Sequence, residues 1–157
     1  MSKKIWIVGF IVVLLLPLAA LSQPRRDFGL GVIVGEPTGL SFKAWTGGST
    51  ALAGAAAWSF GGRDAFQLHV DYLFHNFRLM RVSKGRLPFY YGIGARVRFH
   101  EGGGDDDTVL GIRFPLGLEY LFASPSLGIF AEIVPILDLT PATDFDMNAA
   151  IGFRIYF

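Results

Sequence analysis

The stretch PFYYGIGARVRFH, residues 88–100, indicates the fold most clearly, because its odd and even positions carry side chains of different polarity. The odd positions carry only apolar side chains, namely Phe89, Tyr91, Ile93, Ala95, Val97 and Phe99. The even positions carry a tyrosine, glycines and basic residues, namely Tyr90, Gly92, Gly94, Arg96, Arg98 and His100. A period of two is typical of a β-strand that has apolar surroundings on one side and polar or crowded surroundings on the other.

The same alternation recurs along the chain, most clearly over residues 66–75, 110–122 and 147–157. Clusters of glycine, proline, serine and aspartate separate the alternating segments and indicate turns. Eight strands are predicted, at about residues 27–34, 39–45, 50–60, 65–81, 87–100, 109–122, 127–139 and 146–157. No helical period interrupts them, so the pattern predicts an all-β protein, an eight-stranded antiparallel up-and-down barrel.

Two prolines, Pro115 and Pro135, lie inside predicted strands. Proline has no backbone N–H to donate to a β-ladder, so each should mark a bulge or a local break.

The first residues predict an export signal. Lys3 and Lys4 precede the apolar run IWIVGFIVVLLLPLAAL at 5–21, and small residues follow around Ser22. This arrangement predicts a secretory signal peptide over residues 1–22 and a barrel domain over residues 23–157. The alternative is an uncleaved anchor helix, since the run approaches the roughly 20 residues that span a bilayer, but Pro17 favours cleavage.

Composition excludes several protein classes. Hydrophobic residues make up 52% of the chain and charged residues only 17%, which excludes intrinsic disorder. The absence of cysteine excludes disulfides, zinc–thiolate sites, a cysteine nucleophile and a lipoprotein anchor. Loss of Lys3 and Lys4 with the signal peptide lowers the 14 Lys and Arg residues to 12, against 13 Asp and Glu, so nucleic-acid binding is disfavoured.

Alternation alone permits two barrels, because a soluble lipocalin-like barrel also alternates, with its apolar face around a ligand. The apolar stripes here are six or seven residues long, while the other face is rich in glycine with few charges. Such a face suits the narrow interior of an eight-stranded barrel, so we expect the apolar face to contact lipid. Aromatic residues should then form two girdles, one of Phe28, Trp45, Phe74, Phe89, Tyr91, Tyr120, Phe122 and Phe157, the other of Trp58, Phe60, Phe66, Phe99 and Phe145.

In this transmembrane arrangement the charged side chains of the strands face the lumen. They are Lys43, His69, Asp71, Arg96, Arg98, Arg113, Glu119, Glu132, Asp138 and Arg154. Buried ions must be paired, so we expect a network of ion pairs that plugs the barrel. Position along the strands predicts that Glu132 faces Arg154 and that Asp71 lies near Arg96. The alternative is a narrow gated channel for ions or small solutes.

Other chemistry finds little support. His69 and His75 should lie about 20 Å apart along one strand, too far to share a metal ion without other ligands. The aspartates at 105–107 suggest a weak calcium contact or, more simply, a solvated loop. No catalytic signature is present, so we expect no enzymatic activity and no cofactor.

Four segments carry a resemblance to a known family: GEPTGLSFKAW (35–45), LPFYYGIGARVRF (87–99), GIRFPLGLEYLF (111–122) and EIVPILDLTPATDFDMNAAIGFRIYF (132–157). They resemble an uncharacterised family of small bacterial outer-membrane β-barrel proteins, and more broadly are similar to OmpA-type and OmpX-type eight-stranded barrels. The alternating end of the chain, Phe153, Ile155 and Phe157, resembles the C-terminal signal that the barrel insertion machinery recognises.

The resemblance implies a protein of the bacterial outer membrane whose partners are membrane lipid and the insertion machinery, with an unidentified extracellular protein as a further candidate partner. A structural or surface-interaction role is the leading hypothesis. A small channel, a secreted soluble barrel for an apolar ligand and an outer-membrane enzyme are the alternatives.

Overall fold

The computed structural model describes residues 27–59, 65–100, 108–124, 126–140 and 142–157. Nine strands form one antiparallel sheet: β1 (Phe28–Gly35), β2 (Thr38–Trp45), β3 (Thr50–Ser59), β4 (Ala65–Asn76), β5 (Phe89–His100), β6 (Thr108–Arg113), β7 (Leu116–Leu121), β8 (Leu127–Thr140) and β9 (Asp144–Tyr156). The predicted signal peptide, residues 1–22, lies outside the described residues. No helix among the described residues is long and apolar enough to cross a bilayer.

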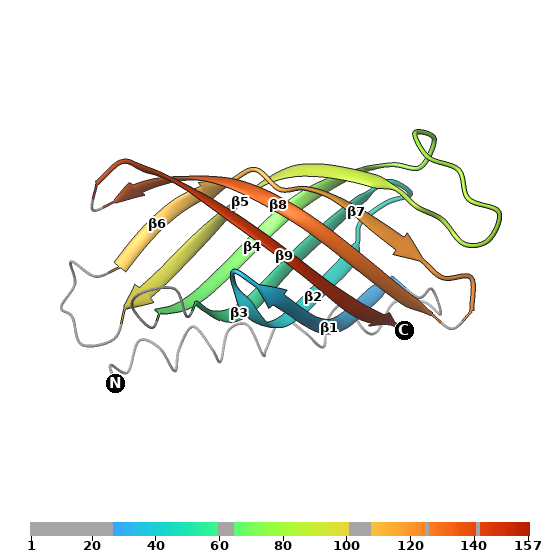
Figure 1. The fold of residues 1–157 in the computed structure, drawn as a ribbon, viewed down its shortest axis with the longest axis horizontal. Coiled ribbons are helices and arrows are strands. Elements are labelled where there is room, and N and C mark those ends of the chain that lie inside the picture. Colours follow the sequence, from blue (N-terminus) through green and yellow to red (C-terminus); the bar gives the residue numbers. More distant parts are fainter. Residues whose placement is uncertain (1–26, 60–64, 101–107, 125, 141) are drawn as a thin grey trace.

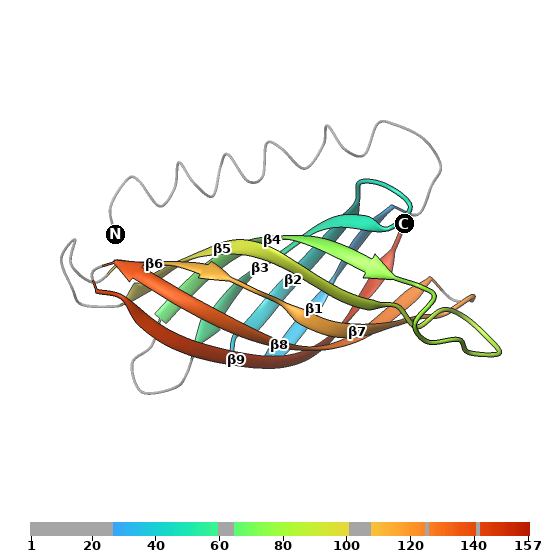
Figure 2. The ribbon, with the colours of Figure 1, turned by 90° about the horizontal axis from the view of Figure 1, so that it is seen from above.

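The sheet closes on itself. Its strand order is β4-β3-β2-β1-β9-β8, then β6 and β7, then β5, and β5 pairs with β4. β1 pairs with β9, so the first and last strands meet, as the up-and-down prediction requires (Figures 1 and 2). The predicted all-β barrel is confirmed.

The structure has nine strands where eight were predicted because the sixth is interrupted. β6 and β7 both pair with β5 on one side and β8 on the other, and Pro115 lies between them. The Phe114 N–H donates to the carbonyl of Pro135 at 2.9 Å, so the break lies directly opposite the second proline. The two missing N–H donors therefore fall at one place in the barrel wall, which confirms the break expected at Pro115.

β4 is shorter than predicted. The alternation appeared to continue to residue 81, but the strand ends at Asn76. The Asn76 side chain accepts hydrogen bonds from the N–H groups of Arg78 at 2.9 Å and Leu79 at 3.1 Å, and this turn ends the ladder.

The two ends of the barrel differ in their connections. We call the end where β1 begins and β9 ends the terminal rim; it also carries the connections 46–49, 77–88 and 122–126. The longest of these, 77–88, extends past the barrel wall on the same side as the C-terminus (Figure 1). The other end, the opposite rim, joins β1 to β2 and β8 to β9.

Burial alternates as the sequence alternates. The apolar stripes lie on the outside, where Ile93 and Ile133 are each 52% exposed, whereas Arg113 and Glu119 in the interior are 0% exposed. Aromatic pairs lie near both rims, with Phe74 and Tyr91 at 5.6 Å near the terminal rim and Trp58 and Phe66 at 5.4 Å near the opposite rim.

The predicted aromatic girdle at the terminal rim is wrong for one residue, Trp45. Trp45 faces inward, because its ring lies 4.2 Å from Nζ of Lys43 and 4.4 Å from the ring of His75. It follows Lys43 by two residues and therefore shares its inward side. Phe60, another predicted member, lies outside the described residues.

Candidate functional site: the charged barrel interior

The interior is filled by polar and charged side chains from every wall of the barrel. The predicted residues Lys43, His69, Asp71, Arg96, Arg113, Glu119, Asp138 and Arg154 are all buried, and the side chains of Arg98 and Glu132 are 20% and 7% exposed. The structure thus brings every predicted lumen residue into the interior, where they form three groups along the barrel axis.

The group nearest the terminal rim is centred on Glu119 of β7. Its carboxylate is paired with the ammonium group of Lys43, accepts the Tyr156 hydroxyl at 2.6 Å and lies 3.6 Å from Arg154. The Arg154 guanidinium packs over the ring of Phe130 at 3.9 Å. One carboxylate thus serves two cations and a hydroxyl from two other strands, β2 and β9.

The middle group is centred on Arg113 of β6. Its Nε and Nη2 donate to the two carboxylate oxygens of Asp71 at 2.9 and 3.2 Å, and Nη2 also lies 3.7 Å from Glu132. The Tyr90 hydroxyl donates to Glu132 at 2.7 Å. The two-point contact fixes the orientation of the guanidinium as well as its position.

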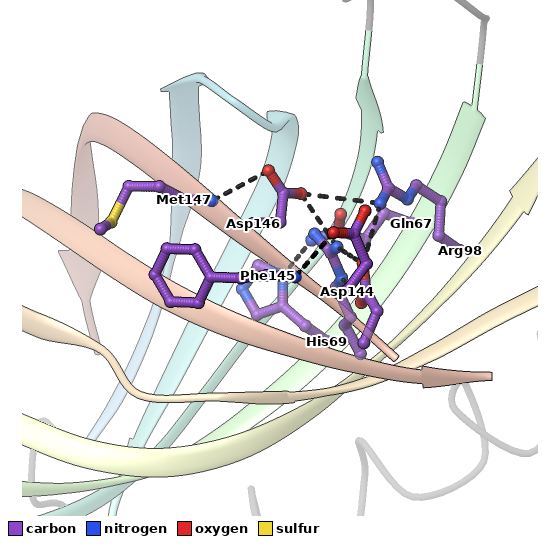
Figure 3. Close-up of polar contacts among 9 residues, drawn as sticks. Gln67, His69, Arg98, Asp144, Phe145, Asp146 and Met147 are labelled. Carbon is purple, nitrogen blue, oxygen red and sulfur yellow. Dashed lines mark hydrogen bonds and ion pairs between the residues drawn. The ribbon is translucent and has the colours of Figure 1, made fainter. Parts of the chain in front are cut away.

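The third group lies toward the opposite rim. Arg96 donates from Nε and Nη2 to Asp138 at 3.1 and 2.6 Å, and from Nη2 to Asp146 at 2.9 Å. Arg98 Nη2 lies 3.5 Å from Asp138 and 3.6 Å from Asp146. Figure 3 shows Arg98 and Asp146 facing each other, with Gln67 and His69 of β4 drawn close by. The side-chain nitrogen of Gln67 lies 3.3 Å from Nδ1 of His69.

Several partners differ from those predicted from position along the strands. Asp71 pairs with Arg113 rather than Arg96, and Glu132 contacts Arg113 and Tyr90 rather than forming the predicted pair with Arg154. The prediction placed partners on adjacent strands. The contacts of Asp71 with Arg113 and of Tyr90 with Glu132 instead reach across one strand, and that strand contributes a glycine.

Glycines make these contacts possible in a regular way. In the strand register, Gly94 lies between Asp71 and Arg113, and Gly111 lies between Arg96 and Asp138. Likewise Gly117 lies between Tyr90 and Glu132. A Cβ at Gly94 would collide with the Asp71 carboxylate, and one at Gly111 would collide with that of Asp138. Each glycine therefore leaves the space in which the flanking side chains meet.

Several residues of the barrel interior were not predicted from the sequence. They are Ser41, Gln67, His75, Tyr90, Asp146 and Tyr156. Their signal was available, because each lies on the inward parity of its strand. All but Asp146 were overlooked because the search followed charge, whereas neutral hydroxyl, amide and imidazole groups also fill the interior.

The terminal end of the interior is closed by an aromatic cluster. The Phe77 ring lies 6.1 Å from Trp45 and 6.2 Å from His75, and the guanidinium of Arg86 lies 4.8 Å above it. His75 in turn lies 2.7 Å from the ammonium group of Lys43. Side chains therefore run without interruption from the connection 77–88 down to the Glu119 group.

The interior offers no ready metal site within the described part of the chain, where no group of three His, Cys, Asp or Glu side chains converges. Three guanidinium nitrogens, Nη1 of Arg96, Nε of Arg98 and Nη1 of Arg113, have no hydrogen-bond acceptor among the described residues. The arrangement can hold ions in pairs and bind water.

No protein-family model matches the chain, and no curated protein matches its sequence. The structure is similar to the crystal structure of the N-terminal β-barrel domain of Pseudomonas aeruginosa OprF, with a TM-score of 0.63 and 14% identity. The match covers 83% of this chain and 95% of the OprF domain. The chain therefore has the fold of an OprF-like β-barrel, while its resemblance to one small-barrel family stays a prediction.

Proposed function

We propose that this protein is an integral barrel of the bacterial outer membrane with a non-enzymatic structural or surface-interaction role. The observation that carries the proposal is the inverted distribution of side chains, with apolar residues outside and ionic groups inside. An apolar outer wall is unfavourable in water and favourable in hydrocarbon. Closure of β1 on β9 pairs the strand edges, which hydrocarbon requires because unpaired backbone groups there cost several kcal/mol each.

The interior supports a plugged barrel. Among the described residues, five cations and five carboxylates form its ion pairs, namely Lys43, Arg96, Arg98, Arg113 and Arg154 with Asp71, Glu119, Glu132, Asp138 and Asp146. Their formal charges balance, so the interior attracts no excess of either ion sign. In this proposal the lumen serves to hold the barrel walls together.

Export and assembly follow from the chain ends. Residues 1–22 direct secretion, and lipid and the barrel insertion machinery are the partners. Phe153, Ile155 and Phe157 are all exposed on the outer wall, where that machinery could bind them. The terminal rim then faces the periplasm. We propose no nucleic-acid partner, and the connections at the opposite rim are the surface available to an extracellular protein.

Membrane fractionation combined with gel migration tests the proposal. The expected result is a protein in the outer-membrane fraction that migrates differently before and after boiling. Recovery of the folded protein from the periplasm without detergent would contradict it and favour a soluble barrel.

A narrow channel is the second candidate. The specific observation in its favour is the three buried guanidinium nitrogens that have no acceptor within the described part of the chain and are suited to bind water inside the barrel. Planar-bilayer recording separates the two functions. A plugged barrel gives no discrete current steps, whereas steps that change in Arg96→Ala would establish conduction through the interior.

A further inference from the structure

An apolar groove crosses the outer wall of the barrel. It has a volume of about 800 Å³. Its lining follows one register row across five strands, through Phe89, Leu118, Ala131, Ile151 and Val34. Ala131 and, in the neighbouring row, Ala149 have short side chains, so the floor lies below the flanking leucine and isoleucine side chains.

The groove has the dimensions of a lipid tail within one leaflet. Four steps between neighbouring strands, at about 4.8 Å each, give a length of about 19 Å. The strands are tilted by about 40° from the membrane normal, and the row of lining residues runs perpendicular to the strands. The row therefore extends about 12 Å along the normal, close to the roughly 15 Å thickness of the hydrocarbon of one leaflet. The groove begins at Phe89, the first residue of β5, so this end of the groove lies at the terminal rim.

A basic connection lies at that end of the groove. Residues 77–88 contain four basic residues, Arg78, Arg81, Lys84 and Arg86, and no Asp or Glu (Figure 1). The hydroxyl of Tyr120, an outward residue two positions after Leu118, donates to the Lys84 carbonyl at 2.6 Å. This bond holds Lys84 over the outer wall beside the groove. Arg86 points instead to the lumen mouth, where it stacks on Phe77.

We propose that the groove and the connection 77–88 bind a phospholipid with an anionic headgroup. The tail lies in the groove, and Lys84 and Arg81 face the phosphate. The inference rests on the proposed membrane function and adds a lipid class to it. Charge complementarity selects an anionic over a zwitterionic headgroup, because each basic side chain near an anionic surface contributes about fivefold in binding. Leu79, which is 63% exposed in the same connection, extends the apolar contact beyond the wall.

Native mass spectrometry of the detergent-purified barrel tests the proposal, with phosphatidylglycerol and phosphatidylcholine as probes. The wild-type protein should retain phosphatidylglycerol more strongly. The double variant Arg81→Gln/Lys84→Gln should lose roughly 25-fold in phosphatidylglycerol affinity, from two fivefold contributions, and keep its affinity for phosphatidylcholine. The variant Ala131→Leu/Ala149→Leu fills the groove and should weaken binding of both lipids.

Ala95→Leu is the matched control, since Ala95 is an exposed outward alanine of β5 that does not line the groove. It should bind both lipids as the wild type does. Equal retention of the two lipids by the wild type would overturn the proposal. Competition by soluble glycerol phosphate or by peptidoglycan fragments would also overturn it, because the basic connection would then bind a soluble anion or the cell wall.

Gel migration of each variant separates this inference from the proposed function. A variant that binds no lipid but still shifts on boiling remains a folded barrel, so the lipid site alone fails. A wild-type chain that is soluble without detergent refutes both.

Discussion

Replacing Arg113 with methionine should lower the free energy of unfolding by about 3–5 kcal/mol, the usual cost of removing one partner from a buried ion pair. Arg113 is 0% exposed and bridges two carboxylates, with two hydrogen bonds to Asp71 and a contact of 3.7 Å to Glu132. Methionine fills a similar volume, so the loss reports the charge and the hydrogen bonds rather than a cavity.

Urea titration of the barrel refolded in lipid vesicles measures the effect. With a slope of about 2 kcal/mol per molar, a loss of about 4 kcal/mol lowers the midpoint by about 2 M. The double variant Asp71→Leu/Arg113→Met removes both ions and should recover at least about 2 kcal/mol relative to the sum of the single variants. Tyr90 still donates to Glu132 in this background and limits the remaining cost.

The exposed Arg78 of the connection 77–88 supplies the control, because Arg78→Met should change stability by less than about 0.5 kcal/mol. A cost under about 1 kcal/mol for Arg113→Met, additive with the cost of Asp71→Leu, would contradict a buried, unsolvated ion pair. That result is typical of solvated ion pairs, and it would favour a water-filled channel over a plugged interior.

Three further predictions test the wall, the packing and the chain end. Ile93→Arg, near the middle of β5, should lower the free energy of unfolding in vesicles by about 2–4 kcal/mol, because it places a charge against lipid. Leu79→Arg in the connection 77–88 should lower it by almost nothing. Equally small effects of the two variants in urea titrations would show that the outer wall lies in water. Gly94→Ala should lower the free energy of unfolding by about 1–3 kcal/mol, because its methyl group collides with Asp71. Gly48→Ala should leave it unchanged, because a Cβ there meets no atom within 4 Å. A Gly94→Ala variant as stable as the wild type in urea titrations would show that the contact between Asp71 and Arg113 across β5 can rearrange. Phe157→Ser should reduce outer-membrane assembly in cells more than it reduces refolding in detergent. Phe122→Ser, which changes another exposed aromatic residue near the terminal rim, should affect neither assay. An equal loss in both assays for Phe157→Ser would mean that Phe157 stabilises the barrel through its contact with Phe28 and is not an insertion signal.

Much of the barrel follows from local pattern. The alternation around Ile93 identifies a strand and its two faces, and the excess of apolar over charged residues indicates which face is outside. Strand 89–100 and the last strand were predicted to within a few residues. Even the break at Pro115 follows from the sequence, because the missing N–H donor is a property of the residue itself.

The ionic partners could not be obtained in this way. Which carboxylate meets Arg113 depends on the register between β5 and β6, and on Gly94 leaving the space above β5 open. The early end of β4 likewise depends on the turn that the Asn76 side chain makes with the N–H groups of Arg78 and Leu79. The inward side of Trp45, by contrast, follows from its spacing from Lys43 and was open to prediction. Alternation specifies the side of a strand to which a residue points, but the position of neighbouring strands along one another is set by closure of the whole barrel, and that position selects each ion pair.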